Sequence, residues 1–155
     1  MKSLFFVGIA AALAAQSVVT QKTLSLGLAK TMAEAALAEC KVKGFNTSVV
    51  VVDRAGQTLV SLRDENASAQ TMEMARRKAY TARMFRMSTL DFQKRTDDPK
   101  YKAQRDVADI LALGGGVPIN IGNDTIGGIA SSGSSQEQDD ACARAGIAKA
   151  ADALR

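Results

Sequence analysis

Basic side chains concentrate in one short stretch of the sequence. Four cations fall within eight residues, at Arg76, Arg77, Lys78 and Arg83. Guanidinium and ammonium groups at this density can hold ligand carboxylates, such as the propionates of a tetrapyrrole. The same charges also suit the solvated face of a surface helix. Composition leaves both interpretations open.

The absence of histidine excludes several kinds of catalytic site and metal site. Without this residue, one chain has no Ser-His-Asp or Cys-His catalysis, no HExxH zinc site and no histidine ligand for a metal or a haem. Two cysteines, Cys40 and Cys142, are too few for a zinc site of their own. In an oxidising compartment they could pair as a disulfide, but each lies in an apolar helical pattern and could equally be a buried thiol.

Other groups could contact a ligand or an ion. Met84 carries a soft thioether that can line or ligate a haem pocket, although methionine on a helix more often fills the core. Glu137, Asp139 and Asp140 lie together where a helix is predicted to begin. Carboxylates there complement the helix dipole, and they could also bind a metal ion. From the sequence alone, the metal is unknown.

Three glycines, Gly114, Gly115 and Gly116, precede Val117 and Pro118. Glycine permits positive φ and close approach, so their N–H groups could face an anionic ligand. The segment is not a Walker loop, because it lacks the Lys-Ser/Thr pair and runs into a predicted strand instead of a helix. The simpler interpretation is a tight turn before an edge strand that tolerates Pro118.

A helix and a hairpin are the first elements that would position these groups. Ser25 can cap a helix that ends at Gly44. Its apolar stripe consists of Leu28, Met32, Ala36 and Cys40. The sequence predicts strands at 48–53 and 57–63, joined by a short loop at 54–56. Four consecutive valines in the first strand are typical of a central strand that is covered on both faces.

Helical spacing returns over 68–85, with the cations mostly on its outer face. The polar segment 88–104 predicts one or two helical turns around Leu90 to Phe92 in a mobile surface segment. The sequence Asp98-Pro99 would break these turns.

A second hairpin is predicted next, with strands at 117–121 and 125–130. Ser134 and Ser135, with Glu137 and Gln138 three positions on, then form a capping-box signature that opens a last helix extending to about Ala153. This order of elements favours an α+β fold, in which a central antiparallel β-sheet is flanked by helices in a single domain.

The beginning of the chain has the pattern of an export signal. Lys2 is followed by an apolar run from Leu4 to Ala15 that ends in small residues. We therefore expect a signal peptide at 1–15 and a periplasmic or secreted domain at 16–155, without membrane contact after cleavage. The net charge of +4 is mild and does not indicate a nucleic-acid partner.

Five blocks of the sequence resemble, in order, the GlcG/HbpS-like haem-binding proteins, a family also found as the C-terminal type of domain in PduO proteins. The blocks are Val51–Gly56 with Leu62-Arg63, Arg77–Ala82, Leu113–Pro118, Gly127–Ile129, and Glu137–Asp139 with Ala145-Gly146. The resemblance implies an antiparallel sheet flanked by helices and assembly into homo-oligomers. For some secreted relatives it implies haem binding with a sensing, scavenging or protective role.

Two positions depart from the pattern of this family. Some relatives carry a Glu-x-x-Glu pair that takes up iron, whereas here Glu73 is followed at the second place by Arg76. Iron binding is therefore not carried over to that site. The place near the glycines where a threonine would serve in haem ligation is Ile110 here.

These observations predict an exported, oligomeric protein that binds haem or a related tetrapyrrole. Lys78 and Arg83 would contact the propionates, and the Gly114–Gly116 turn would shape the pocket. Tyr80 or Met84 is the expected iron ligand.

Two other functions stay open. A small cofactor-free isomerase or lyase that acts on an acidic metabolite would need Lys78, Tyr80, Asp53 or another carboxylate as its acid or base. A non-catalytic scaffold or sensor subunit would instead expose a large apolar patch to a protein partner.

Overall fold

The computed structural model describes residues 19–155 of the chain, so the predicted export signal lies outside the described residues. Four antiparallel strands in the order β2-β1-β4-β3 form one sheet, which is packed by helices. The elements are α1 (Leu26–Val42), β1 (Ser48–Val52), β2 (Thr58–Arg63), α2 (Gln70–Phe85), α3 (Thr89–Asp97), η1 (Lys102–Asp106), β3 (Gly116–Ile121), β4 (Asp124–Ser132), α4 (Gln136–Lys149) and η2 (Ala151–Leu154). The predicted α+β fold is confirmed.

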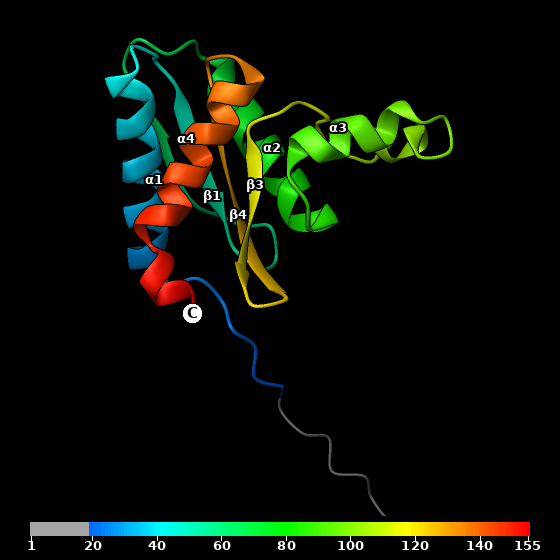
Figure 1. Ribbon diagram of the computed structural model, residues 1–155, viewed down its shortest axis with the longest axis horizontal. Helices are drawn as coiled ribbons and strands as arrows, with labels where there is room; N and C mark the ends of the chain where they lie inside the picture. Colours follow the sequence, from blue (N-terminus) through cyan, green and yellow to red (C-terminus); the bar gives the residue numbers. More distant parts are fainter. Residues whose placement is uncertain (1–18) are drawn as a thin grey trace, which may run out of the picture.

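The helices form a layer on each face of the sheet. Helices α1 and α4 lie side by side over one face, and α2 covers the other (Figure 1). Side chains of β1 alternate between the two layers, because successive residues of a strand point to opposite faces. Val49 and Val51 pack in the α1 and α4 layer, whereas Val50 and Val52 pack against α2.

Strand β1 is therefore the central element of the core. All its residues are buried, as the run of valines predicts. Each fully buried valine contributes about 1.5–3 kcal/mol relative to an exposed one. This strand fixes the position of the turn that follows it, and that turn forms part of the candidate site.

The segment after α2 differs from the sequence-based expectation. It forms the nine-residue helix α3 and the short helix η1, which project from the body of the molecule (Figure 1). Ser88 caps α3 by accepting a hydrogen bond from the Asp91 N–H. Phe92 is fully buried and lies 4.3 Å from the Phe85 ring, centroid to centroid. A single buried aromatic side chain thus anchors a segment whose composition is polar.

A disulfide between Cys40 and Cys142 links α1 to α4. The two residues are 102 positions apart in sequence, and both are fully buried. The structure thus selects the disulfide over the pair of buried thiols. Closing a loop of this length removes chain entropy from the unfolded state, by about 4–5 kcal/mol in the loop-entropy model.

Replacing both cysteines by alanine should lower the free energy of unfolding by about 2–5 kcal/mol, because the unfolded chain regains that entropy. Urea titration followed by circular dichroism measures the difference. Wild-type protein that is first unfolded, reduced and then measured in dithiothreitol should match the double variant. Equal stability of the oxidised protein and the variant would contradict this role of the disulfide.

Candidate functional site

The structure divides the residues singled out in the sequence into two groups. Lys78 and the three glycines lie in the interior, at the end of the sheet where α4 begins. Tyr80, Arg83 and Met84 are only partly buried and lie on the side of α2 that faces the β1–β2 turn. These two groups have different chemistry.

Lys78 forms a buried ion pair. The side chains of Lys78 and Asp139 are 1% and 2% exposed, and their Nζ and Oδ2 atoms are 3.0 Å apart. The ammonium group also donates to the Ser131 carbonyl, at 3.2 Å. Ser134 donates to Asp139 Oδ1 through its hydroxyl, at 2.7 Å, and through its N–H, at 3.1 Å. Both charges are thus compensated in a site without water access.

The electrostatics of Lys78 follow from this burial. Desolvation lowers the pKa of the Lys78 ammonium, and the charge and hydrogen bond of Asp139 oppose the shift. The expectation that Lys78 contacts a ligand propionate needs correction. Its ammonium points into the interior, where Asp139 already supplies the carboxylate.

The glycine turn encloses this ion pair. A Cβ atom on Gly115, whose φ is +123°, would lie 2.8 Å from the Asp139 Cβ and 3.0 Å from the Lys78 Nζ. A Cβ on Gly116 would overlap the Lys78 carbonyl. Only glycine therefore allows this backbone to pass so close to the pair.

Two N–H groups of the turn are bonded within the protein. The Gly114 N–H donates to Gln136 Oε1, at 2.7 Å, and the Gly116 N–H donates to Thr89 Oγ1, at 2.8 Å. The turn leads into the edge strand β3, as the simpler interpretation predicts. The turn thus encloses the ion pair, and its Gly114 and Gly116 N–H groups are not available to an anionic ligand.

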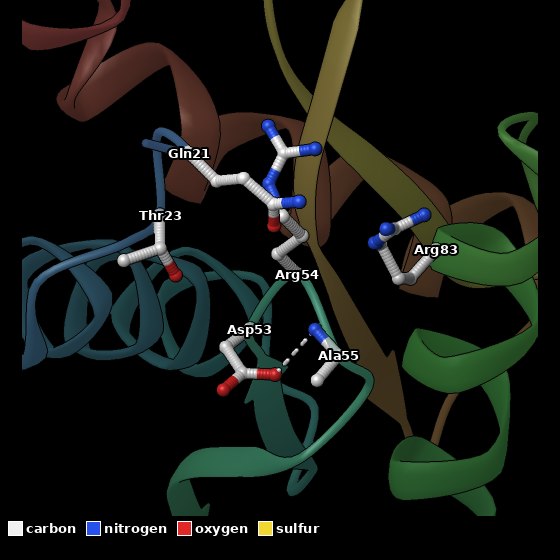
Figure 2. A pocket seen from close by; sticks show the side chains of 6 residues that line it. All are labelled: Gln21, Thr23, Asp53, Arg54, Ala55 and Arg83. Atoms are coloured by element: carbon white, nitrogen blue, oxygen red, sulfur yellow. Dashed lines mark hydrogen bonds between the residues drawn. The ribbon is translucent and has the colours of Figure 1, made fainter. Parts of the chain in front are cut away.

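A cavity of about 510 Å³ lies beside the second group of residues. Its walls come from three parts of the chain, as Figure 2 shows: the segment before α1, the β1–β2 turn and α2. The lining residues are Gln21, Thr23, Asp53, Arg54, Ala55 and Arg83. The volume lies in the range of ordinary small-molecule pockets.

The β1–β2 turn is rigidly built. Asp53 Oδ1 accepts hydrogen bonds from the N–H groups of Ala55, at 2.8 Å, and Gln57, at 2.9 Å. Asp53 is thus a turn residue, as its position in the sequence predicts. A Cβ on Gly56, whose φ is +82°, would lie 2.6 Å from Met84 Cε and 2.8 Å from the Tyr80 ring. Tyr80 and Met84 therefore pack against the tip of this turn, directly after Ala55 of the cavity wall.

Arg83 carries the main electrostatic signal of the cavity. Within residues 19–155, its buried Nε atom has no hydrogen-bond partner. Desolvation and the nearby charges of Arg54 and Arg86 lower the pKa of the Arg83 guanidinium, against the weaker effects of Asp124 and Asp53. An anion placed beside this guanidinium would oppose the shift, because an opposite charge favours the protonated form.

Arg54 is a second cation of the pocket that sequence reasoning missed. Its Nη2 pairs with Asp124, and its Nε donates to the Lys22 carbonyl at 2.6 Å. It thereby holds the segment before α1 against the turn. Asp124 is 70 residues away in sequence, so no local pattern indicates this contact.

Of the three acidic residues considered for a metal ion, Asp139 pairs with Lys78 and Asp140 pairs with Arg144. Arg76 binds both Glu73 and Asp109, at 2.7 and 2.6 Å. Among residues 19–155, no group of three Asp, Glu or Cys side chains is placed to hold a metal ion.

Comparison with known proteins identifies the family. Residues 24–148 match a family model described as "Haem degrading protein HbpS-like". The chain belongs to the HbpS-like family. An uncharacterised 15.0 kDa protein from the dhaT-dhaS intergenic region of Citrobacter freundii is 34% identical over 125 residues, which cover 76% of this chain and 84% of that protein.

Two solved structures extend the comparison of this HbpS-like chain. A double mutant of HbpS from Streptomyces reticuli superposes with a TM-score of 0.82 at 35% identity, covering 91% of this chain and 97% of that one. A complex of PduOC with heme superposes with a TM-score of 0.73 at 26% identity, covering 81% and 94%. In the part of the HbpS-like chain that the structure describes, no helix is both long and apolar enough to cross a membrane.

Replacing Lys78 by methionine should destabilise the protein by about 3–5 kcal/mol, because Asp139 is then left buried without a counterion. A Lys78→Met/Asp139→Leu double variant should recover much of this loss. Urea unfolding measures both effects. Lys43→Met, which breaks the partly exposed pair with Glu39, serves as a control with little expected change. A double variant no more stable than the single one would contradict the ion-pair explanation.

Proposed function

We propose that this HbpS-like protein binds haem or a related tetrapyrrole, and that the pocket beside Arg83 receives the ligand's carboxylates. The observation that carries the proposal is the buried Nε of Arg83, which has no hydrogen-bond partner within residues 19–155 and lies beside a cavity of about 510 Å³. A carboxylate is the natural partner for a guanidinium, because charge-assisted hydrogen bonds satisfy both groups. The family description and the complex of PduOC with heme support tetrapyrrole as the ligand class.

Two residues beside the pocket, although not in its lining, carry groups of the kind that bind haem iron. Tyr80 offers a phenol and Met84 a thioether, and both side chain types ligate haem iron in other proteins. They pack on the turn that forms one wall of the cavity. When bound, haem would supply its iron chemistry, while Arg83 would orient the macrocycle by its carboxylate-bearing edge.

Export and self-association belong to the same proposal. The apolar pattern of residues 1–15 and the Cys40–Cys142 disulfide support an oxidising compartment outside the cytoplasm. We infer that the protein acts there as a homo-oligomer that senses haem, scavenges it or protects the cell from it.

The isomerase or lyase alternative gains no support from the described residues. Of its acid and base candidates, Lys78 is paired with Asp139, and Asp53 accepts two hydrogen bonds of its own turn. A group held in this way is a poor proton carrier, since its protonation state is tied to its partners. Tyr80 packs its ring against Gly56. Haem binding thus explains the site with fewer assumptions.

Titration of the mature protein, residues 16–155, with haemin tests the proposal. A saturable change of the Soret band at micromolar concentrations is expected. Replacing Arg83 by glutamine should weaken binding about tenfold or more, because one charged hydrogen-bond partner of the carboxylate is lost. Arg86→Gln, an exposed cation next to the pocket, is the matched control and should change affinity much less. Absence of any saturable change in the wild type would refute the proposal.

The same titration distinguishes the two iron ligands. Tyr80→Phe or Met84→Leu should change the position of the Soret band if the replaced group binds iron, while leaving the propionate contact with Arg83 in place. A spectrum that is unchanged in both variants would show that neither group is the ligand.

A further inference from the structure

The two guanidinium groups of the pocket differ in their present partners. Figure 2 shows Arg54 reaching from the β1–β2 turn and Arg83 from α2, on two sides of the same cavity. The Nε of Arg83 has no partner within residues 19–155, whereas Arg54 is already bonded to Asp124 and to the Lys22 carbonyl. A first ligand carboxylate therefore meets an available cation, and a second one meets an occupied cation.

Asp124 is the carboxylate that pairs with Arg54. It is the first residue of β4 and follows the tight turn at Gly122. The hydrogen bond and charge of Arg54 hold the pKa of the Asp124 carboxyl below its ordinary value, with help from Arg83 and Lys22. Asp124 thus serves as the counterion of Arg54, with Arg83 and Lys22 nearby.

The contact between Arg54 and Asp124 is one that a ligand can replace. The Asp124 side chain is 50% exposed and the Arg54 side chain 22% exposed. An ion pair that is open to water is weak, because both partners are well hydrated when they separate. The Nε bond to the Lys22 carbonyl involves a different edge of the guanidinium, so losing Asp124 does not release the cavity wall.

We propose that Asp124 is an internal competitor for Arg54, which makes the pocket selective for ligands with two carboxylates. The first carboxylate binds Arg83, and the second displaces Asp124 from Arg54. A ligand with one carboxylate gains only the contact with Arg83. This inference uses the pocket of the proposed function but does not depend on porphyrin or iron.

Nuclear magnetic resonance of the mature protein tests the inference without haem. The Nε–Hε signals of Arg54 and Arg83 are followed during titration with butyrate and with linear dicarboxylates from succinate to suberate. Butyrate should shift the Arg83 signal and leave Arg54 nearly unchanged. At least one dicarboxylate should shift both signals with a single dissociation constant. If no dicarboxylate shifts Arg54, the inference is wrong.

Removing the competitor should strengthen binding. Asp124→Asn should raise the affinity for that dicarboxylate about fivefold, which is the upper range for loss of an exposed ion pair. Asp97→Asn makes the same change of charge at an exposed pair on α3 and should leave the affinity unchanged.

A double-variant cycle separates competition from a general effect of charge. In an Arg54→Gln background, Asp124→Asn should give no further gain, because the group for which Asp124 competes is absent. A gain of the same size in that background would overturn the inference in favour of a simple field effect. Failure of haemin to bind would refute the proposed function and leave these results standing, so the two outcomes are distinguishable.

Discussion

The buried ion pair between Lys78 and Asp139 is the constraint on which the arrangement of the layers depends. Lys78 belongs to α2 and Asp139 to α4, and these helices lie on opposite faces of the sheet. A charge without water must have a close counterion, so Lys78 on α2 and the start of α4 have to lie next to each other. The glycine turn before β3 has to pass beside the pair, and the end of β4 supplies the Ser131 carbonyl.

This pair also explains why the four cations of α2 do not act as one anion-binding patch. Lys78 is paired with Asp139 in the interior. Arg76 binds Asp109, and Arg77 donates to the Ile110 carbonyl, both in the segment before β3. Only Arg83 remains beside a cavity with an unused donor among the described residues. The candidate site is therefore made by one cation of the cluster together with Arg54, which comes from a different element.

The sequence predicts most elements because their signals are local. The valine run of β1, the cap at Ser25 and the turn at Asp53 each depend on residues a few positions apart, and the structure confirms them. Of the two serines before α4, the structure uses Ser135 as the cap. The site depends on distant contacts: 61 residues separate Lys78 from Asp139, and 70 separate Arg54 from Asp124. A single sequence carries no signal for such pairs, so its pattern predicts a ligand contact for Lys78 that the structure does not show. The sequence predicts only one or two turns in place of α3 for a related reason, since only tertiary contact reveals that Phe92 is buried.

The link between Cys40 and Cys142 has a consequence for the order in which the chain matures. Its two sulfurs come from the first and last long helices, and the entire sheet lies between them in the sequence. No oxidant can join them in a nascent chain that has presented only its first half. Covalent closure therefore requires synthesis of the whole sheet-forming sequence, and a chain that ends before α4 cannot form this link.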